Sequence, residues 1–237
     1  MKSLQVVTPH LECIYNCPFC IAKTHKHNNQ FINNYLKNHD YWKNNLIKVI
    51  NDNKDLNYVV ITGTNEPMQT KECVKDIIDI VRSTNPNIQL EIQTHYYKEN
   101  VIYKDLDVVA YSIPFYNLIR NIKPCGRINR YVILLTDTFN LYTLNDLLEV
   151  IPDNVNQITF KALHDSKGIN KEVDDYINNH KMSIERLNKL KEEVLNYKKD
   201  KSIRIDEFCM DSTDRYKIFR EDGNLYDDWD QVKIWKK

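Results

Sequence analysis

The chain has 237 residues, of which 42% are hydrophobic and 28% are charged, with 33 basic and 33 acidic side chains. This length suits one sizeable α/β domain, and the composition is ordinary for a soluble globular protein. The balanced charge leaves a nucleic-acid substrate unsupported, and no apolar run is long enough to cross a bilayer.

The first residues of the chain are too few and too polar to form a signal peptide. We therefore expect a cytoplasmic protein whose thiols stay reduced. In that compartment the six cysteines do not imply disulfides.

Strand-like apolar segments alternate with amphipathic helical segments as far as about residue 161, a pattern typical of parallel strands joined by helices. The expected strands cover residues 4–8, 58–62, 88–94, 108–112, 131–135 and 157–161. The expected helices include residues 31–50, with Leu36, Leu46, Ile47 and Ile50 as core candidates, 74–81 and 144–151. Six parallel strands with right-handed crossovers predict an α/β fold, a partial (β/α)6 TIM-like barrel.

The last third of the chain has a different pattern. A helix is expected over 184–197 with Ser183 as its cap, followed by a strand over 202–208. Residues 216–226 predict a hairpin that turns at Asp222-Gly223. We divide the chain into a core, 1–165, and a small C-terminal helix/hairpin extension, 166–237, that closes the barrel and covers the site. The hairpin is a candidate lid. Its turn residues either face substrate or are solvated, and they are Arg220, Glu221 and Asp222.

A C-x3-C-x2-C motif follows the first strand and consists of Cys13, Cys17 and Cys20. Three soft sulfur ligands suit iron–sulfur chemistry, and a four-iron cluster held by three cysteines leaves one iron open to another ligand. Two alternatives remain. The triplet could belong to a Cys3His zinc site, or it could be three unrelated thiols in a turn. The zinc site would be completed by His10, His25 or His27.

A second motif, Thr62-Gly63-Thr64-Asn65-Glu66-Pro67, comes directly after the second expected strand. Glycine is scarce in this chain, and at this point it permits a turn and exposes peptide groups to a ligand. The Glu66 carboxylate suits an ammonium group. The structural alternative is an ordinary strand-to-helix turn with Pro67 at the start of a helix.

Together the two motifs resemble those of the radical S-adenosylmethionine (SAM) superfamily, over about residues 4–165. Both the aromatic residue before the third cysteine and the G-x-G-E-P element match, although Asn65 stands where glycine is commoner. Asparagine tolerates left-handed backbone geometry better than other non-glycine residues, so this departure is compatible with the motif. The resemblance implies a [4Fe–4S] cluster on the three cysteines, with SAM at the open iron. The cofactor-binding residues that it implies are Phe19, Thr62, Gly63, Asn65, Glu66, Gln93 and Ser112. The alternatives are a plain core aromatic for Phe19 and solvated strand-end residues for Gln93 and Ser112.

The resemblance also implies a reaction. A reduced cluster, supplied by a flavodoxin- or ferredoxin-type donor, cleaves SAM to a 5′-deoxyadenosyl radical that abstracts a hydrogen atom from the substrate. The short, neutral chain favours a small-molecule or nucleotide-like substrate. The alternatives are an activase for a glycyl-radical enzyme and a non-catalytic zinc-binding module. No catalytic residue is assigned.

The remaining candidates carry less information. Lys161 and His164 follow the sixth expected strand, and Cys73, Cys125 and Cys209 stand apart from the motif. Because a second cluster needs three or four close cysteines, we expect one cluster and no cysteine-rich auxiliary domain.

Overall fold

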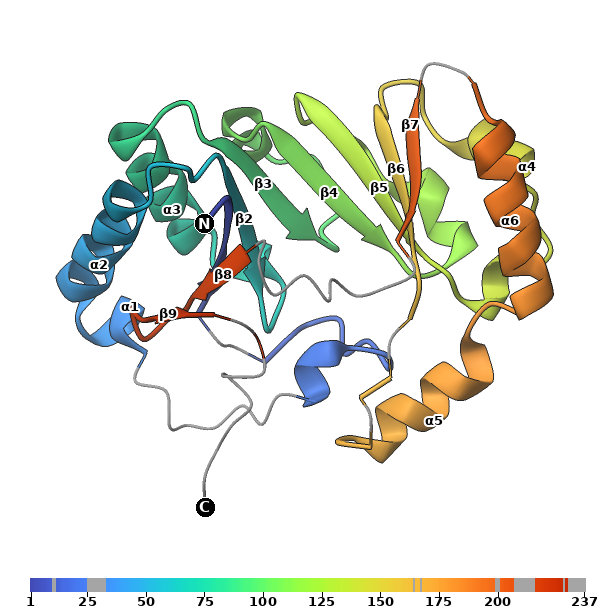
Figure 1. The fold of residues 1–237 in the computed structure, drawn as a ribbon, viewed down its shortest axis with the longest axis horizontal. Coiled ribbons are helices and arrows are strands. Elements are labelled where there is room, and N and C mark those ends of the chain that lie inside the picture. The colour runs from blue at the N-terminus through green and yellow to red at the C-terminus, as the bar shows by residue number, and fades with distance from the viewer. Residues whose placement is uncertain are drawn as a thin grey trace.

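The computed structural model describes residues 1–9, 12–24, 33–163, 165–166, 168–198, 201–206, 216–227 and 229. Its centre is a nine-stranded sheet with the order β7-β6-β5-β4-β3-β2-β1-β8-β9 (Figure 1). The strands are β1 (Ser3–Thr8), β2 (Tyr58–Gly63), β3 (Gln89–Thr94), β4 (Val108–Ile113), β5 (Ile128–Leu134), β6 (Gln157–Lys161), β7 (Ser202–Asp206), β8 (Tyr216–Phe219) and β9 (Leu225–Tyr226).

Each pair of neighbouring strands is parallel, except the β8–β9 hairpin. The α helices are α1 (Asn34–Lys37), α2 (His39–Asp52), α3 (Lys71–Thr84), α4 (Leu144–Val150), α5 (Lys171–His180) and α6 (Ile184–Asn196). Five short 3-10 helices join them: η1 (Ile21–Thr24), η2 (Pro67–Gln69), η3 (Val101–Asp105), η4 (Tyr116–Asn121) and η5 (Asp137–Phe139). The predicted α/β class with a mainly parallel sheet is confirmed. None of the helices within the described part of the chain is long and apolar enough to span a membrane.

The core lies between one face of the sheet and the helices, with α2 and α3 beside one half and α4 and α6 beside the other (Figure 1). Side chains alternate between the faces of a strand, so each core residue is followed by one that points to the other face. Ile61 and Ile92 are fully buried in the helix-covered core. Their neighbours Thr62 and Gln93 therefore project from the opposite face, which helices leave open.

The first predicted helix differs from the structure at its start. Residues 31 and 32 lie outside the described residues, and α1 and α2 divide the remainder of the predicted helix at Asn38, whose side chain accepts the Tyr41 N–H and caps α2. Leu46 and Ile50 are buried as predicted, whereas Leu36 is 68% exposed and is not a core residue. The reason is that Leu36 belongs to the short α1, which buries none of its residues.

The C-terminal extension does not close the sheet in the described part of the chain; instead it lengthens the sheet at both edges. Of the strand predicted over 202–208, residues 202–206 form β7, which pairs in parallel with β6, and residues 207 and 208 lie outside the described residues. The predicted hairpin is present as β8 and β9, but β8 pairs in parallel with β1 at the far edge. The strands of the extension thus belong to the same sheet as those of the core, and the two ends of that sheet stay apart.

The hairpin turn is buried, so the alternative that its residues are solvated is wrong. Arg220 and Glu221 form an ion pair, and both side chains are 3% exposed. The Trp42 indole N–H donates to the Arg220 carbonyl at 3.1 Å, and the Asn45 amide donates to the Gly223 carbonyl at 3.1 Å. Gly223 has a φ of +81°, as the predicted Asp-Gly turn requires. The turn is therefore docked on α2.

Candidate functional site

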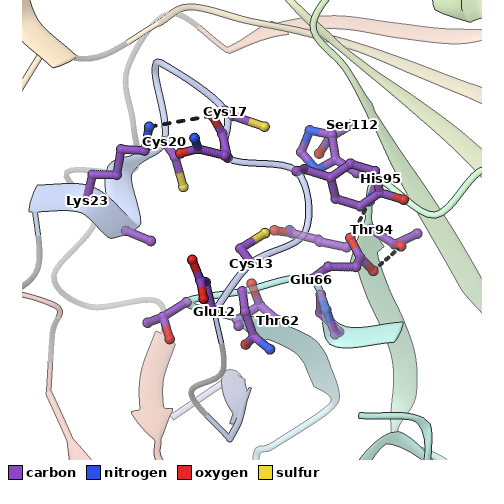
Figure 2. Close-up of a pocket in the computed structure, with 18 residues that line it drawn as sticks. Glu12, Cys13, Cys17, Cys20, Lys23, Thr62, Glu66, Thr94, His95 and Ser112 are labelled. Atoms are coloured by element: carbon purple, nitrogen blue, oxygen red, sulfur yellow. Dashed lines mark hydrogen bonds between the residues drawn. The ribbon is translucent and has the colours of Figure 1, made fainter. Parts of the chain in front are cut away.

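A cavity of about 490 Å³ opens at the C-terminal ends of β1 to β4, where ligands bind in parallel sheets. It brings together the cysteine loop and the segments that follow β2 and β3 (Figure 2). The lining residues are Glu12, Cys13, Tyr15, Asn16, Cys17, Cys20, Ala22, Lys23, Thr62, Gly63, Thr64, Asn65, Glu66, Pro67, Gln93, Thr94, His95 and Ser112.

The three cysteines of the motif lie on one loop, and Figure 2 shows this loop facing Thr62, Glu66 and Ser112 across the cavity. Asn16 has a φ of +41°, and among the described residues it is the one non-glycine residue with a positive φ. This left-handed residue reverses the chain between Cys13 and Cys17, so asparagine suits the position. The loop then continues through a Cys20 N–H to Cys17 carbonyl hydrogen bond of 3.2 Å into η1.

Both later cysteines of the loop lie in surroundings that favour the protonated thiol. The pKa of Cys17 is raised to about 11, mainly by burial and in smaller part by the neighbouring Cys20 and Cys13. Burial also raises the pKa of Cys20, to which Cys13 again contributes. The three sulfur atoms are close enough to interact electrostatically. Thiolates at this site repel one another, so they need a bound cation to offset that repulsion.

The arrangement of these thiols bears on the kind of metal centre that they could hold. In the residues that the structure describes, no three histidine, cysteine, aspartate or glutamate side chains converge on a point for a single ion. A cluster instead takes one thiolate per iron, so its ligands surround a volume and need not meet at a point. The three cysteines line one cavity, and this placement is compatible with a cluster. His10, His25 and His27, which could complete a zinc site, lie outside the described residues.

The second motif forms a close turn beside the cysteine loop. A Cβ on Gly63 would lie 2.6 Å from the Thr8 hydroxyl and 2.8 Å from the Asn65 carbonyl oxygen, so only glycine fits. Gly63 therefore serves close approach to β1, and its φ is not positive. Asn65 does not have left-handed geometry either, because among the described non-glycine residues that geometry occurs at Asn16.

Glu66 is 3% exposed and anchors this turn to β3. Its carboxylate accepts the Thr94 hydroxyl at 2.5 Å, the His95 N–H at 2.7 Å and the Met68 N–H at 3.0 Å. Burial raises the pKa of Glu66, and these three donors partly offset that effect by stabilising the charged form. The carboxylate thus has structural partners already and retains a lone-pair site for a cation in the cavity.

Two residues that line the cavity, Asn65 and His95, each have a buried polar atom, Nδ2 and Nε2 respectively, with no hydrogen-bond partner among the described residues. Burial lowers the pKa of His95 to about 4, so the ring is neutral at neutral pH. Leaving such groups unsatisfied costs about 1–3 kcal/mol each, and a polar ligand would supply their partners.

Most of the predicted site residues meet at this cavity. Thr62, Gly63, Asn65, Glu66, Gln93 and Ser112 line it together with the three cysteines. Phe19 does not line it. That ring is 9% exposed and packs with Val173 and Ile177 of α5, which favours the core-aromatic alternative for Phe19.

The other candidates lie elsewhere. Lys161 ends β6 and does not line the cavity, Cys73 is buried in α3, and Cys125 precedes β5. His164 and Cys209 lie outside the described residues. Arg220, Glu221 and Asp222 do not line the cavity either, so the docked hairpin does not cover it in this structure. Tyr15, Lys23 and His95 were not predicted as site residues; Tyr15 and Lys23 lie within or beside the cysteine motif, which gave a signal for them, whereas no motif marks His95.

No protein-family profile and no curated protein matches the sequence. The fold resembles crystal structures of SuiB from Streptococcus suis. For SuiB bound to S-adenosylmethionine the TM-score is 0.64 at 13% identity, and the match covers 99% of this chain and 62% of SuiB. For SuiB bound to precursor peptide SuiA the TM-score is 0.62 at 13% identity, covering 99% and 61%. Uncomplexed SuiB gives 0.63 at 11% identity, covering 99% and 62%. This likeness shows a shared fold, and the chain spans about three-fifths of the length of SuiB.

Proposed function

We propose that this chain is a radical SAM enzyme built on an open, partial TIM-like barrel and active in the cytoplasm. One observation carries the proposal: the cysteine triplet and the Gly63–Glu66 turn line the same cavity at the C-terminal ends of parallel strands. The two motifs are far apart in the sequence. The fold of a protein solved with SAM bound supports the same reading.

In this proposal Cys13, Cys17 and Cys20 hold a [4Fe–4S] cluster. When reduced by a flavodoxin- or ferredoxin-type donor, the cluster supplies the electron that splits SAM into methionine and a 5′-deoxyadenosyl radical. Glu66 provides a negative charge for the SAM ammonium group beside the cluster loop. Gln93 and Ser112 reach the cavity from adjacent strands and offer polar contacts to the rest of SAM.

The surroundings of the site partly enclose the proposed reaction. Glu66 is 3% exposed, and Cys17 and Cys20 are half-buried at the cavity. Exclusion of water protects a reactive intermediate from side reactions. The protein's part is thus to bind SAM, place the substrate carbon and keep solvent out.

The substrate proposed first is a small or nucleotide-like molecule, on the grounds of a short, neutral chain. A peptide is the second candidate, because SuiB, which shares the fold, has been solved with a precursor peptide. An activase for a glycyl-radical enzyme remains the further alternative for a protein partner.

Anaerobic reconstitution with iron and sulfide tests the proposal. We expect a brown protein with about four irons per chain that forms 5′-deoxyadenosine from SAM under reduction. Cys17→Ala should lose both the cluster and this product, whereas Cys125→Ala should keep both. A colourless wild-type protein with one tightly bound zinc would contradict the proposal and favour the zinc-binding module. Deoxyadenosine formation stimulated by peptides, but not by nucleotides or other small molecules, would favour the second substrate class.

A further inference from the structure

The side chain of Gln69 holds the backbone on both sides of Cys13. The Ile14 N–H donates to Gln69 Oε1 at 3.2 Å, and Gln69 Nε2 donates to the Glu12 carbonyl at 3.0 Å. One carboxamide therefore satisfies the donor that follows the cysteine and the acceptor that precedes it. The carboxamide thus bonds the backbone of Glu12 and Ile14 much as a neighbouring β-strand would. These two hydrogen bonds fix the course of the backbone through Cys13.

Gln69 is itself held rigidly, at the end of η2. The Gln69 N–H donates to the Glu66 carbonyl at 3.0 Å, and the Glu66 carboxylate caps η2 through the Met68 N–H. The same carboxylate is bonded to Thr94 and His95 at the end of β3. A continuous series of hydrogen bonds thus runs from the sheet through Glu66 and η2 to the first cysteine.

Few other bonds attach the cysteine loop to the fold. Within the described residues, hydrogen bonds from outside reach residues 12–24 at two places, the Gln69 pair at one end and Asn170 at the other. The Asn170 amide donates to the Lys23 carbonyl at 3.1 Å, beyond the third cysteine. Gln69 is therefore the hydrogen-bonded anchor at the Cys13 end of the loop.

We propose that Gln69 is a positioning residue that holds Cys13 in place for the metal centre; the inference rests on the proposed function, because it needs a cluster on the loop. Gln69 acts through the backbone of Glu12 and Ile14 and does not touch the metal. Without it, the Cys13 end of the loop loses both of its hydrogen bonds to the fold, while the sheet and its helices keep theirs.

The test compares three variants of the full chain. Gln69→Leu removes both bonds at similar size, and Gln69→Glu keeps an acceptor for Ile14 but sets an oxygen against the Glu12 carbonyl. Gln89→Leu serves as the matched control. It makes the same Gln-to-Leu change at an exposed residue, at the end of β3 that lies away from the cavity. Each protein is reconstituted anaerobically. The measurements are the rate of iron loss to a ferrous chelator, the electron paramagnetic resonance spectrum of the reduced cluster, and the melting temperature of the metal-free chain.

We expect Gln69→Leu to lose iron about tenfold faster than wild type, from the loss of two hydrogen bonds, and to show an altered spectrum. Its metal-free melting temperature should match wild type, since the anchor supports the loop and not the core. Gln69→Glu should lose iron at an intermediate rate, and Gln89→Leu should behave as wild type.

Wild-type iron loss and an unchanged spectrum in Gln69→Leu would overturn the inference while leaving the proposed function intact. A metal-free melting temperature lowered in both Gln69 variants would also overturn it, because Gln69 would then support the fold itself. A wild-type chain that takes up no cluster at all would instead refute the proposed function.

Discussion

Glu66 is buried, carries a carboxylate and contacts two backbone segments. Because Gln has nearly the same shape without the charge, replacing Glu66 by Gln tests the charge separately. We expect Glu66→Gln to keep the cluster but to weaken SAM binding about tenfold or more, because a charge-assisted contact to the ammonium is lost. Calorimetric titration of reconstituted protein with SAM measures this effect.

The matched control for that experiment is Glu72→Gln, which neutralises an exposed glutamate in the first turn of α3. It should leave SAM affinity unchanged. Equal affinity of Glu66→Gln and wild type would remove Glu66 from the SAM site and leave it the structural role of joining η2 to β3.

His95 predicts how stability depends on pH. Its pKa is about 4 in the folded protein and 6.5 for an ordinary histidine, so between these values the unfolded chain binds a proton that the folded chain does not. Stability therefore falls as pH decreases through this window. The contribution of His95 is about 2 kcal/mol between pH 7 and pH 5.

Denaturant unfolding at both pH values checks this expectation. Wild type should lose more stability between pH 7 and pH 5 than His95→Gln, which has no titrating ring. The same loss in the two proteins would show that His95 is protonated as readily in the folded state as in the unfolded one.

At the scale of elements, the hairpin is a structural support for α2. Trp42→Phe keeps an aromatic ring against Phe219 but leaves the Arg220 carbonyl without the indole donor. We expect a loss of about 1–2 kcal/mol in the free energy of unfolding, with iron content and SAM affinity unchanged. Impaired SAM binding in this variant would instead support the earlier expectation that the hairpin belongs to the site.

Elements that a local sequence pattern determines were predicted, whereas contacts between distant segments were not. Buried runs of β-branched residues predicted the six strands to within a few residues, and a regular apolar stripe predicted α3. The helix α5 was missed, because its buried residues are Val173 and Ile177, one pair at helical spacing. The pairing of β8 with β1 was missed because no local pattern encodes a contact between the two ends of a chain.

The candidate site could be predicted where residue type alone carries the chemistry. Cysteines and a glutamate after a glycine are visible in a sequence, and adjacent parallel strands bring them to one edge. Gln69 and His95 could not be recognised in this way. Gln69 contributes through backbone contacts and His95 through burial, and both depend on how the segments pack.

At the scale of the whole molecule, the sheet makes the two predicted domains depend on each other. A chain ending at residue 165 would lose β8 from the edge of β1 and β7 from the edge of β6. It would also lose the contacts of Phe19 with α5. Exposed strand edges pair with other chains, so we expect this fragment to aggregate.

Circular dichroism and size-exclusion chromatography of the fragment provide the measurement, with the full chain as reference. Aggregation or non-cooperative unfolding is the expected result. A monomeric fragment with a cooperative transition would support the boundary at residue 165 that the sequence suggested.

The parallel pairing of β8 with β1 also has a consequence for the order in which the sheet forms during synthesis. A ribosome delivers β1 and the cysteine loop before β2 to β7, and it delivers β8 only after them. Until β8 is made, one edge of β1, the strand that leads into the cysteine loop, lacks its neighbour. Under the proposed function, we therefore expect a cluster to be loaded after β8 has joined the sheet.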